Sequence, residues 1–366
     1  MRTFSLIRKL ARNWRVKVLL QNLIGLLPGA LGFRLNEQLT RLIRGGAIES
    51  RVNFEARIRS GIENLELMQS TCGVRIRNKC ILEWGTGWHG IDIILFYLAG
   101  AREIYTFDHH GHLSYPNFRK SIQQCLEHPD MLKLLGTESE SAVHDERIAV
   151  LKRVYVDKAP NSELLKAFNV HYLIAPDCSP ERFNGPSVKI DIFYSNSVLQ
   201  RIPESILVTN LQRLNKDWFS SDISFFHKLD LFDANALRHV DQSLWRLHYL
   251  YYSDFTFTKL ISGRFNSQNR LRECEFIRLF EMLGLSARHI KSYIDREDVK
   301  RIAKHKLAAR FKDYLPEELA VTHSLLAFRR DPLSQPLSCH TDLSRSVREI
   351  EYYDYQTVID RKSNVA

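Results

Sequence analysis

The fold follows from Ile81-Leu82-Glu83-Trp84-Gly85-Thr86-Gly87-Trp88-His89-Gly90, in which an apolar strand runs through a glycine-rich turn toward a helix. Glycines allow positive φ and a close approach of the backbone to a ligand, and the N–H groups that open the helix can hold an anion. A second apolar run ends in Asp108, 23 residues after Gly85, near the spacing of about 20 residues at which a carboxylate reaches a ribose hydroxyl pair. The order strand, turn, helix, strand and acid predicts a site for a cofactor that carries a ribose.

Strand-like apolar runs alternate with amphipathic, helix-like segments along the chain. Strands are expected at 80–82, 104–107, 171–174, 190–194 and 223–226, with two more near 288–293 and 322–328. Helices are expected at 90–99, 115–127, 203–216 and 270–283. This alternation favours a parallel sheet covered on both faces. We therefore expect an α/β fold: a Rossmann-like, seven-stranded, mostly parallel sheet with helices on both faces and a helical N-terminal extension.

Composition divides the chain into three parts. Residues 1–70 are basic and helix-like, residues 71–331 hold the alternating pattern, and residues 332–366 form a polar, serine-rich tail. Within the middle part, residues 231–268 form an insertion, and its segment 245–257 is dense in aromatics. Two interpretations explain these aromatics: a substrate lid that stacks on sugars or aromatic acceptors, or a cap that packs on the domain.

The net charge of +10 is concentrated near the N-terminus, because residues 1–60 carry 12 Lys and Arg against 3 Asp and Glu. Such a local patch excludes a protein whose whole surface binds nucleic acid, and we expect no nucleic-acid partner. Residues 1–17 form a basic amphipathic segment and predict a peripheral contact with an anionic membrane. A solvated helix face or a helix packed on the core are the alternatives.

The location of the protein is predicted from three features. No apolar run reaches the roughly 18 to 20 residues that a membrane span needs. The six cysteines show no disulfide or zinc spacing, and the basic leader lacks a clean cleavage site. We expect a cytoplasmic protein, peripheral to the inner membrane, that keeps its first 60 residues.

Two cofactors, NAD and S-adenosylmethionine, use the layout of the glycine turn, and three features favour the methyl donor. Glu83, two residues before the first glycine, suits a cationic amine and a sulfonium better than a pyrophosphate. About 80 residues of helix-like sequence precede the turn, whereas dinucleotide folds often start with it. The fourth strand continues as Asp191-Ile192-Phe193-Tyr194-Ser195-Asn196-Ser197-Val198-Leu199. An NAD-dependent oxidoreductase and a non-catalytic methyltransferase-like scaffold stay open as alternatives.

These residues resemble the class I S-adenosylmethionine-dependent methyltransferases. The glycine motif of that family is matched by residues 83–87, its ribose acid by Asp108 and its fourth-strand signature by residues 191–199. The resemblance runs from about residue 79 to 230 and more loosely to about 330. Within the family, the chain resembles bacterial enzymes found beside surface-glycan genes. The resemblance implies methyl transfer to a small-molecule or glycan acceptor, with a hydroxyl as the target.

The resemblance also implies which residues hold S-adenosylmethionine. They are Glu83, Gly85, Thr86, Gly87, Asp108, Asp177, Ser195 and Asn196. The glycine motif surrounds the methionine end and Asp108 holds the ribose. Asp177 contacts the adenine amine, although an exposed turn aspartate is an equal interpretation of that residue. Ser195 and Asn196 line the site of transfer.

Catalytic residues are expected where the fifth strand ends. His227 is the expected general base for a hydroxyl acceptor, and Asp230 belongs to the same His-x-x-Asp-x-x-Asp pattern, which ends at Asp233. A divalent metal site or a loop with polar caps explains the same pattern.

Two further features bear on the chemistry. The three histidines at 109, 110 and 112 are expected to be solvated, and we expect no metal. Many relatives carry Glu-His where this chain has Gln200-Arg201. A role of that pair in acid or base catalysis therefore does not carry over.

Overall fold

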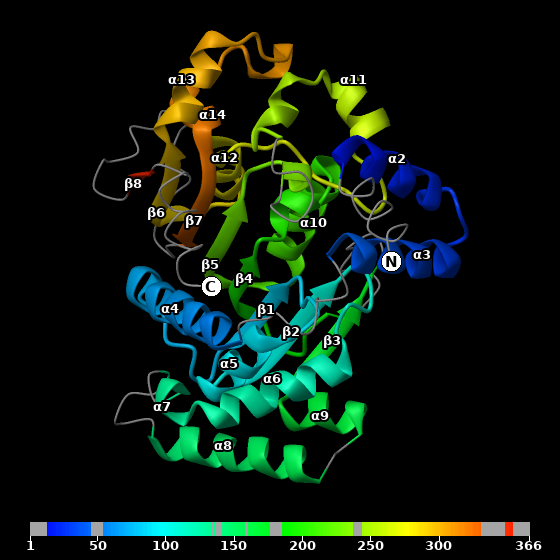
Figure 1. Ribbon diagram of the computed structural model, residues 1–366. Coiled ribbons are helices and arrows are strands. Elements are labelled where there is room, and N and C mark those ends of the chain that lie inside the picture. Colours follow the sequence, from blue (N-terminus) through cyan, green and yellow to red (C-terminus); the bar gives the residue numbers. More distant parts are fainter. Residues whose placement is uncertain are drawn as a thin grey trace.

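The structure is a computed structural model built around a single eight-stranded sheet with the order β3-β2-β1-β4-β5-β7-β6-β8 (Figure 1). It describes residues 13–44, 54–132, 135, 141–157, 160–175, 185–236, 244–330 and 348–353. The strands are β1 Cys80–Trp84, β2 Glu103–Asp108, β3 Val170–Ile174, β4 Ile190–Asn196, β5 Phe219–Asp230, β6 Ser286–Asp295, β7 Val321–Arg329 and β8 Arg348–Tyr353.

The sheet is mostly parallel, since only β7 runs antiparallel to its neighbours β5 and β6. The expected Rossmann-like α/β fold is confirmed. The sequence predicts seven strands, and the structure has eight, because β8 comes from the segment expected to be a polar tail and pairs with β6. The buried carboxylate of Glu273 anchors β8: it accepts a hydrogen bond from Ser292 Oγ at 2.7 Å and binds the Arg348 guanidinium at 2.5 Å.

Helices cover both faces of this sheet. The longer ones are α4 Phe54–Cys72, α5 Ile91–Leu98, α6 Tyr115–Glu127, α8 Ser141–Val156, α9 Asn161–Ala167, α10 Glu204–Asp217, α12 Glu273–Met282 and α13 Arg296–Lys304, and the short ones are α7 Pro129–Leu132, α11 Asp254–Thr256 and α14 Pro316–Ala320. Helices α4, α5, α6 and α8 share an apolar core with Ile81 and Phe226. Helices α10 and α12 share the other core with Leu82 and Phe225. Neighbouring residues of a strand thus belong to opposite cores, as the alternation of side chains requires.

The N-terminal helices α2 Trp14–Gly25 and α3 Gly29–Arg44 pack on the insertion, and Figure 1 shows α2 beside α11. Buried residues Trp14, Val18, Leu39 and Ile43 form a third apolar cluster with Leu244 and Tyr252. Polar contacts join the same parts: Lys17 Nζ donates to Asn235 Oδ1 at 2.9 Å, and Asn22 Nδ2 donates to the Leu260 carbonyl at 2.9 Å. The extension therefore forms part of the wall above the sheet.

The buried guanidinium of Arg272 ties the insertion to the end of the sheet. It donates to the carbonyl oxygens of Leu231 at 2.8 Å and Leu319 at 2.9 Å, and also bonds the Val321 carbonyl and the Tyr249 hydroxyl. Since four acceptors from three stretches of the chain meet at one side chain, removing it takes a hydrogen-bond donor from three buried carbonyls.

We expect Arg272→Met to lower the free energy of unfolding by about 3–5 kcal/mol, because a methionine fills similar volume but donates no hydrogen bond. Arg278→Met is the matched control, because Arg278 lies on the exposed face of α12, the helix that begins directly after Arg272, and its loss should change the free energy by less than about 0.5 kcal/mol. Urea unfolding measures both. Equal stability of the two variants would contradict the structural role of Arg272.

Candidate active site

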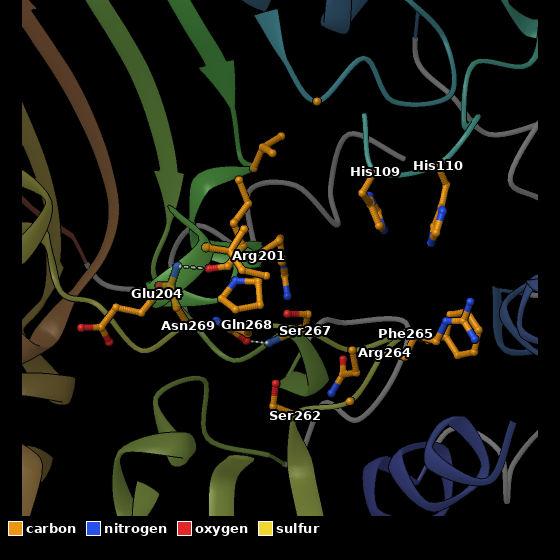
Figure 2. A pocket seen from close by; sticks show the side chains of 18 of the residues that line it. His109, His110, Arg201, Glu204, Ser262, Arg264, Phe265, Ser267, Gln268 and Asn269 are labelled. Atoms are coloured by element: carbon orange, nitrogen blue, oxygen red, sulfur yellow. Dashed lines mark hydrogen bonds between the residues drawn. The ribbon is translucent and has the colours of Figure 1, made fainter. Parts of the chain in front are cut away.

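A cavity of about 1520 Å³ opens at the carboxyl ends of β1, β2 and β4 (Figure 2), the edge at which open α/β sheets bind ligands. The wall on the side of the sheet, named the lower wall after its place in Figure 1, is formed by the glycine turn after β1, the loop after β2 and the segment after β4. Side chains of α2, α3 and the insertion form the opposite, upper wall. The cavity thus lies between the basic N-terminal helices and the apolar sheet.

The two glycines of the turn, Gly85 and Gly87, have different roles. Gly85 has φ +98°, and a Cβ there would lie 2.1 Å from Val198 Cγ2; its N–H donates to the Phe107 carbonyl at 2.7 Å. Gly87 has φ +66°, and a Cβ there would meet nothing within 4 Å. Gly85 therefore allows close packing of the turn, whereas Gly87 leaves space for a ligand in the cavity that both residues line.

Asp108 ends β2 with its carboxylate at the same cavity. Its Oδ2 accepts a hydrogen bond from the Gly87 N–H at 3.3 Å, and its Oδ1 lies 3.0 Å from His109 Nδ1 and 4.0 Å from His112 Nε2. A carboxylate beside an open glycine turn fits a ligand with neighbouring hydroxyl groups, because both carboxylate oxygens are acceptors. Of the predicted cofactor residues, Gly85, Gly87 and Asp108 are brought together at the cavity.

Glu83 and Thr86 lie beneath the turn and do not line the cavity. Glu83 is 2% exposed and accepts a hydrogen bond from Thr106 Oγ1 at 2.6 Å, and the Thr86 and Thr106 hydroxyls are 2.5 Å apart. Burial and the nearby carboxylates of Asp92 and Asp108 raise the pKa of Glu83 well above its ordinary value. The hydrogen bonds that join Glu83, Thr106 and Thr86 hold the glycine turn from the side of the sheet. Glu83 and Thr86 are therefore positioning residues.

The remaining predicted cofactor residues are placed differently. Ser195 is fully buried, with its Oγ 2.9 Å from His227 Nδ1, and neither Ser195 nor Asn196 lines the cavity. The two residues that follow, Ser197 and Val198, do line it. Asp177 lies outside the described residues.

The structure contradicts the expected general base. His227 is fully buried, with ring-centroid distances of 4.7 Å to Phe193, 5.3 Å to Phe225 and 5.2 Å to Phe280. The alternation along β5 turns its side chain into the core under α12, so it does not reach the cavity. Asp230, the second expected catalytic residue, also does not line the cavity and lies 3.9 Å from His323 Nε2.

The loop after β2 and the helix α3 meet at the cavity. The rings of Phe33 and His110 are 3.7 Å apart, and Phe33 lies 5.1 Å from Phe265; Figure 2 shows His109 and His110 on one side, with Phe265 below them. Burial lowers the pKa of His110 to about 4. The ligand atoms of Asp108, His109 and His112 lie within 4.8 Å of one another, an arrangement that could hold a metal ion. The absence of a metal stays a prediction.

Several cavity residues escaped the sequence-based prediction. Lys17 and Gln21 of α2 and the segment 262–270 line the cavity, but no local pattern connects them with the glycine turn 60 or more residues away. Arg201 is a different case, because its departure from the family pattern marked the position. Of the aromatics in 245–257, Phe257 is the one that lines the cavity.

No protein-family model matches the chain, and no curated protein matches it. Among solved structures, an S-adenosylmethionine-dependent methyltransferase from Mesorhizobium loti is 12% identical, with 74% of this chain and 100% of that chain covered and a TM-score of 0.35. Magnesium protoporphyrin IX methyltransferase from Synechocystis PCC 6803, with bound S-adenosylmethionine, is 11% identical, with 80% and 89% covered and a TM-score of 0.37. Likenesses at these identities and TM-scores assign no activity to this chain.

The burial of His227 predicts a pH effect. Burial lowers its pKa to about 3, against about 6.5 in an unfolded chain. The folded state therefore binds this proton less readily, so the stabilisation is fully present above pH 6.5 and is lost as the pH falls from there toward 3.

We expect the ¹³Cε1 NMR signal of His227 to stay constant between pH 9 and 5. We also expect His227→Gln to lose less free energy of unfolding between pH 7 and 5 than the wild type does, by up to about 2 kcal/mol, as measured by urea titration. A His227 signal that titrates near pH 6.5 would refute the burial and reopen a catalytic role.

Proposed function

We propose that this chain is an S-adenosylmethionine-dependent methyltransferase that methylates a hydroxyl of a small-molecule or glycan acceptor. The observation that carries the proposal is the meeting of the Asp108 carboxylate with the open face of Gly87 in one cavity at the ends of β1 and β2. In this proposal, Asp108 accepts hydrogen bonds from the ribose of S-adenosylmethionine. The turn from Gly85 to Gly87 borders the methionine part of the cofactor. Trp84, Phe107 and Val198 supply apolar walls.

Two acids near the start of α5, Glu83 fully buried and Asp92 partly buried, support this cofactor over NAD. Asp92 stands in the first turn of α5, and Glu83 lies under the preceding glycine turn. Burial raises the pKa of both carboxyl groups. A helix N-terminus beside two acids, charged or protonated, offers a pyrophosphate less of the positive end that it needs, whereas a cofactor with a cationic amine and a sulfonium does not need that end. The antiparallel β7 between β5 and β6 also departs from the dinucleotide strand order.

The residues of the chain then have mainly a positioning task. When bound, S-adenosylmethionine supplies a methyl group on a sulfonium, which needs little activation. The protein has to align an acceptor oxygen with that methyl and to keep water out. Lys17, Gln21, Asn36 and Thr40 from α2 and α3 line the wall that faces the glycine turn, so the N-terminal helices are placed to orient a polar acceptor.

We expect calorimetry to show binding of S-adenosylhomocysteine to the wild type. Asp108→Ala should weaken it by about 2–4 kcal/mol, roughly 30- to 700-fold, because two hydrogen bonds to a charged acceptor are lost. Asp313→Ala is the control, since that carboxylate is exposed and lies outside the cavity, and its affinity should match the wild type. The labelled methyl of the donor should appear in an acceptor from cell extract.

Each rival has its own outcome in these experiments. Heat with NAD but not with S-adenosylhomocysteine would support an oxidoreductase and end the proposal. Binding of S-adenosylhomocysteine without methyl transfer to any extract component would favour the non-catalytic scaffold.

A peripheral contact with an anionic membrane is the second part of the proposal. The contact predicted for residues 1–17 falls mostly outside the described residues, which start at 13. The outer face of α2 and the residue that caps it support this contact, because Leu19, Leu23 and the C-cap residue Leu26 recur at helical spacing and are exposed, Leu26 by 83%. Among the described residues, no helix is long and apolar enough to cross a membrane.

We expect the full chain to sediment with vesicles that contain anionic phosphatidylglycerol at low salt, and less so at high salt, since screening weakens the basic segment. Replacing Leu19, Leu23 and Leu26 together by serine should reduce sedimentation severalfold. Leu315→Ser is the control, because Leu315 is equally exposed but distant in sequence. Wild-type protein that stays in the supernatant at low salt would refute the contact.

A further inference from the structure

Arg201 differs from the other arginines that line the cavity. Arg310 binds Glu204 and Glu275, both at 3.1 Å, and Arg270 binds Asp254. Arg264 lies over the Phe33 ring at 4.7 Å and donates to the Leu27 carbonyl at 3.5 Å. The half-buried guanidinium of Arg201 makes no hydrogen bond and no ion pair with any residue in the part of the chain that the structure describes.

A structural role for Arg201 is already filled by a neighbour. Arg201 closes the short 3₁₀ turn Leu199–Arg201 after β4, and the carbonyls there need donors. Asn269 supplies them, since its Nδ2 donates to Leu199 O at 2.8 Å and to Ile202 O at 2.7 Å. The backbone of the turn is therefore satisfied without the guanidinium.

Two carboxylates attract the Arg201 guanidinium, but neither of them contacts it. Asp230 and Asp233 attract it, while burial lowers the pKa of Arg201, but neither carboxylate forms an ion pair with it. Asp233 is already bound by His248 Nδ1 at 3.0 Å and by the Asn235 N–H at 2.7 Å. A partly desolvated guanidinium with five N–H donors is thus available for a ligand.

The position of Arg201 within the cavity indicates which ligand it meets. Val198, three residues earlier, packs on Gly85, while Asp108 stands at the end of the separate strand β2. Figure 2 shows Arg201 together with Gln268 and Ser267, and His109 and His110 on another side. Hence Arg201 borders the cavity on the side of the insertion, away from the expected ribose position.

We propose that Arg201 binds an anionic group, a carboxylate or a phosphate, on the acceptor that is methylated at this site. The inference rests on the proposed function for the identity of the reaction. A planar guanidinium pairs with either group through two parallel hydrogen bonds. The acceptor is then an acidic molecule, such as one that carries a uronic acid or a sugar phosphate, and Arg201 fixes its orientation in the cavity.

The test follows the Arg201 Nε–H signal by NMR in protein saturated with S-adenosylhomocysteine. Sodium acetate and inorganic phosphate are titrated separately at constant ionic strength, with chloride as the balancing ion. We expect a saturable shift at millimolar concentration with one of the two anions, and the better anion identifies the acceptor group as carboxylate or phosphate. The signal is assigned by its loss in Arg201→Gln. Arg310, already paired with carboxylates, is the internal control and should not shift.

Two outcomes would overturn the proposal. One is the absence of a saturable shift of Arg201 with both anions. The other is a tenfold or larger loss of S-adenosylhomocysteine affinity in Arg201→Gln, because Arg201 would then hold the carboxylate of the cofactor and not the acceptor; we expect a change of less than twofold. Failure of the wild type to bind S-adenosylhomocysteine would instead remove the proposed function, and the anion titration, repeated without it, would still report on Arg201.

Discussion

The hydrogen bond from the Gly85 N–H to the Phe107 carbonyl, 2.7 Å long, is the contact on which the site depends. It extends the β1–β2 ladder by one residue past the paired Trp84 and Phe107. With a φ of +98° at Gly85 the chain turns directly after this contact, and Val198 packs where a side chain of residue 85 would stand. The same contact brings Gly87 to Asp108. A local requirement for glycine thus fixes the turn, the packing of β4 against it and the position of the acidic group.

Long-range contacts complete the cavity around this turn. The two N-terminal helices are joined to the insertion by a small apolar cluster and by the hydrogen bond of Lys17 to Asn235. Beneath the turn, buried Glu83 is held by a hydrogen bond from the Thr106 hydroxyl. The lower wall is therefore rigid sheet edge, whereas the upper wall depends on packing between segments more than 200 residues apart. We infer that selectivity for the acceptor resides in the upper wall and in Arg201.

The alternation of apolar runs and helical segments predicted the fold, and the glycines and Asp108 predicted the lower wall of the cavity. The sequence predicted the wrong surroundings for His227 because both faces of the sheet are covered. Residues 223–227 of β5 are buried on both sides of the strand, so the sequence does not show which face His227 occupies. Strand β8 was missed because its anchor, Glu273, lies 75 residues from Arg348. Lys17 and Gln21 are buried at the cavity wall, a contact that no local pattern near the N-terminus encodes.

The central claim is that Asp108 and the Gly85–Gly87 turn form one cofactor site. A crystal structure of the full chain with S-adenosylhomocysteine tests it most directly. We predict that both ribose hydroxyls lie within about 2.5–3.0 Å of the Asp108 carboxylate oxygens and that the ligand occupies the space beside Gly87. Ligand bound elsewhere, or an Asp108 carboxylate that coordinates a metal ion with His109 and His112 and leaves the ribose without contact, would contradict the account.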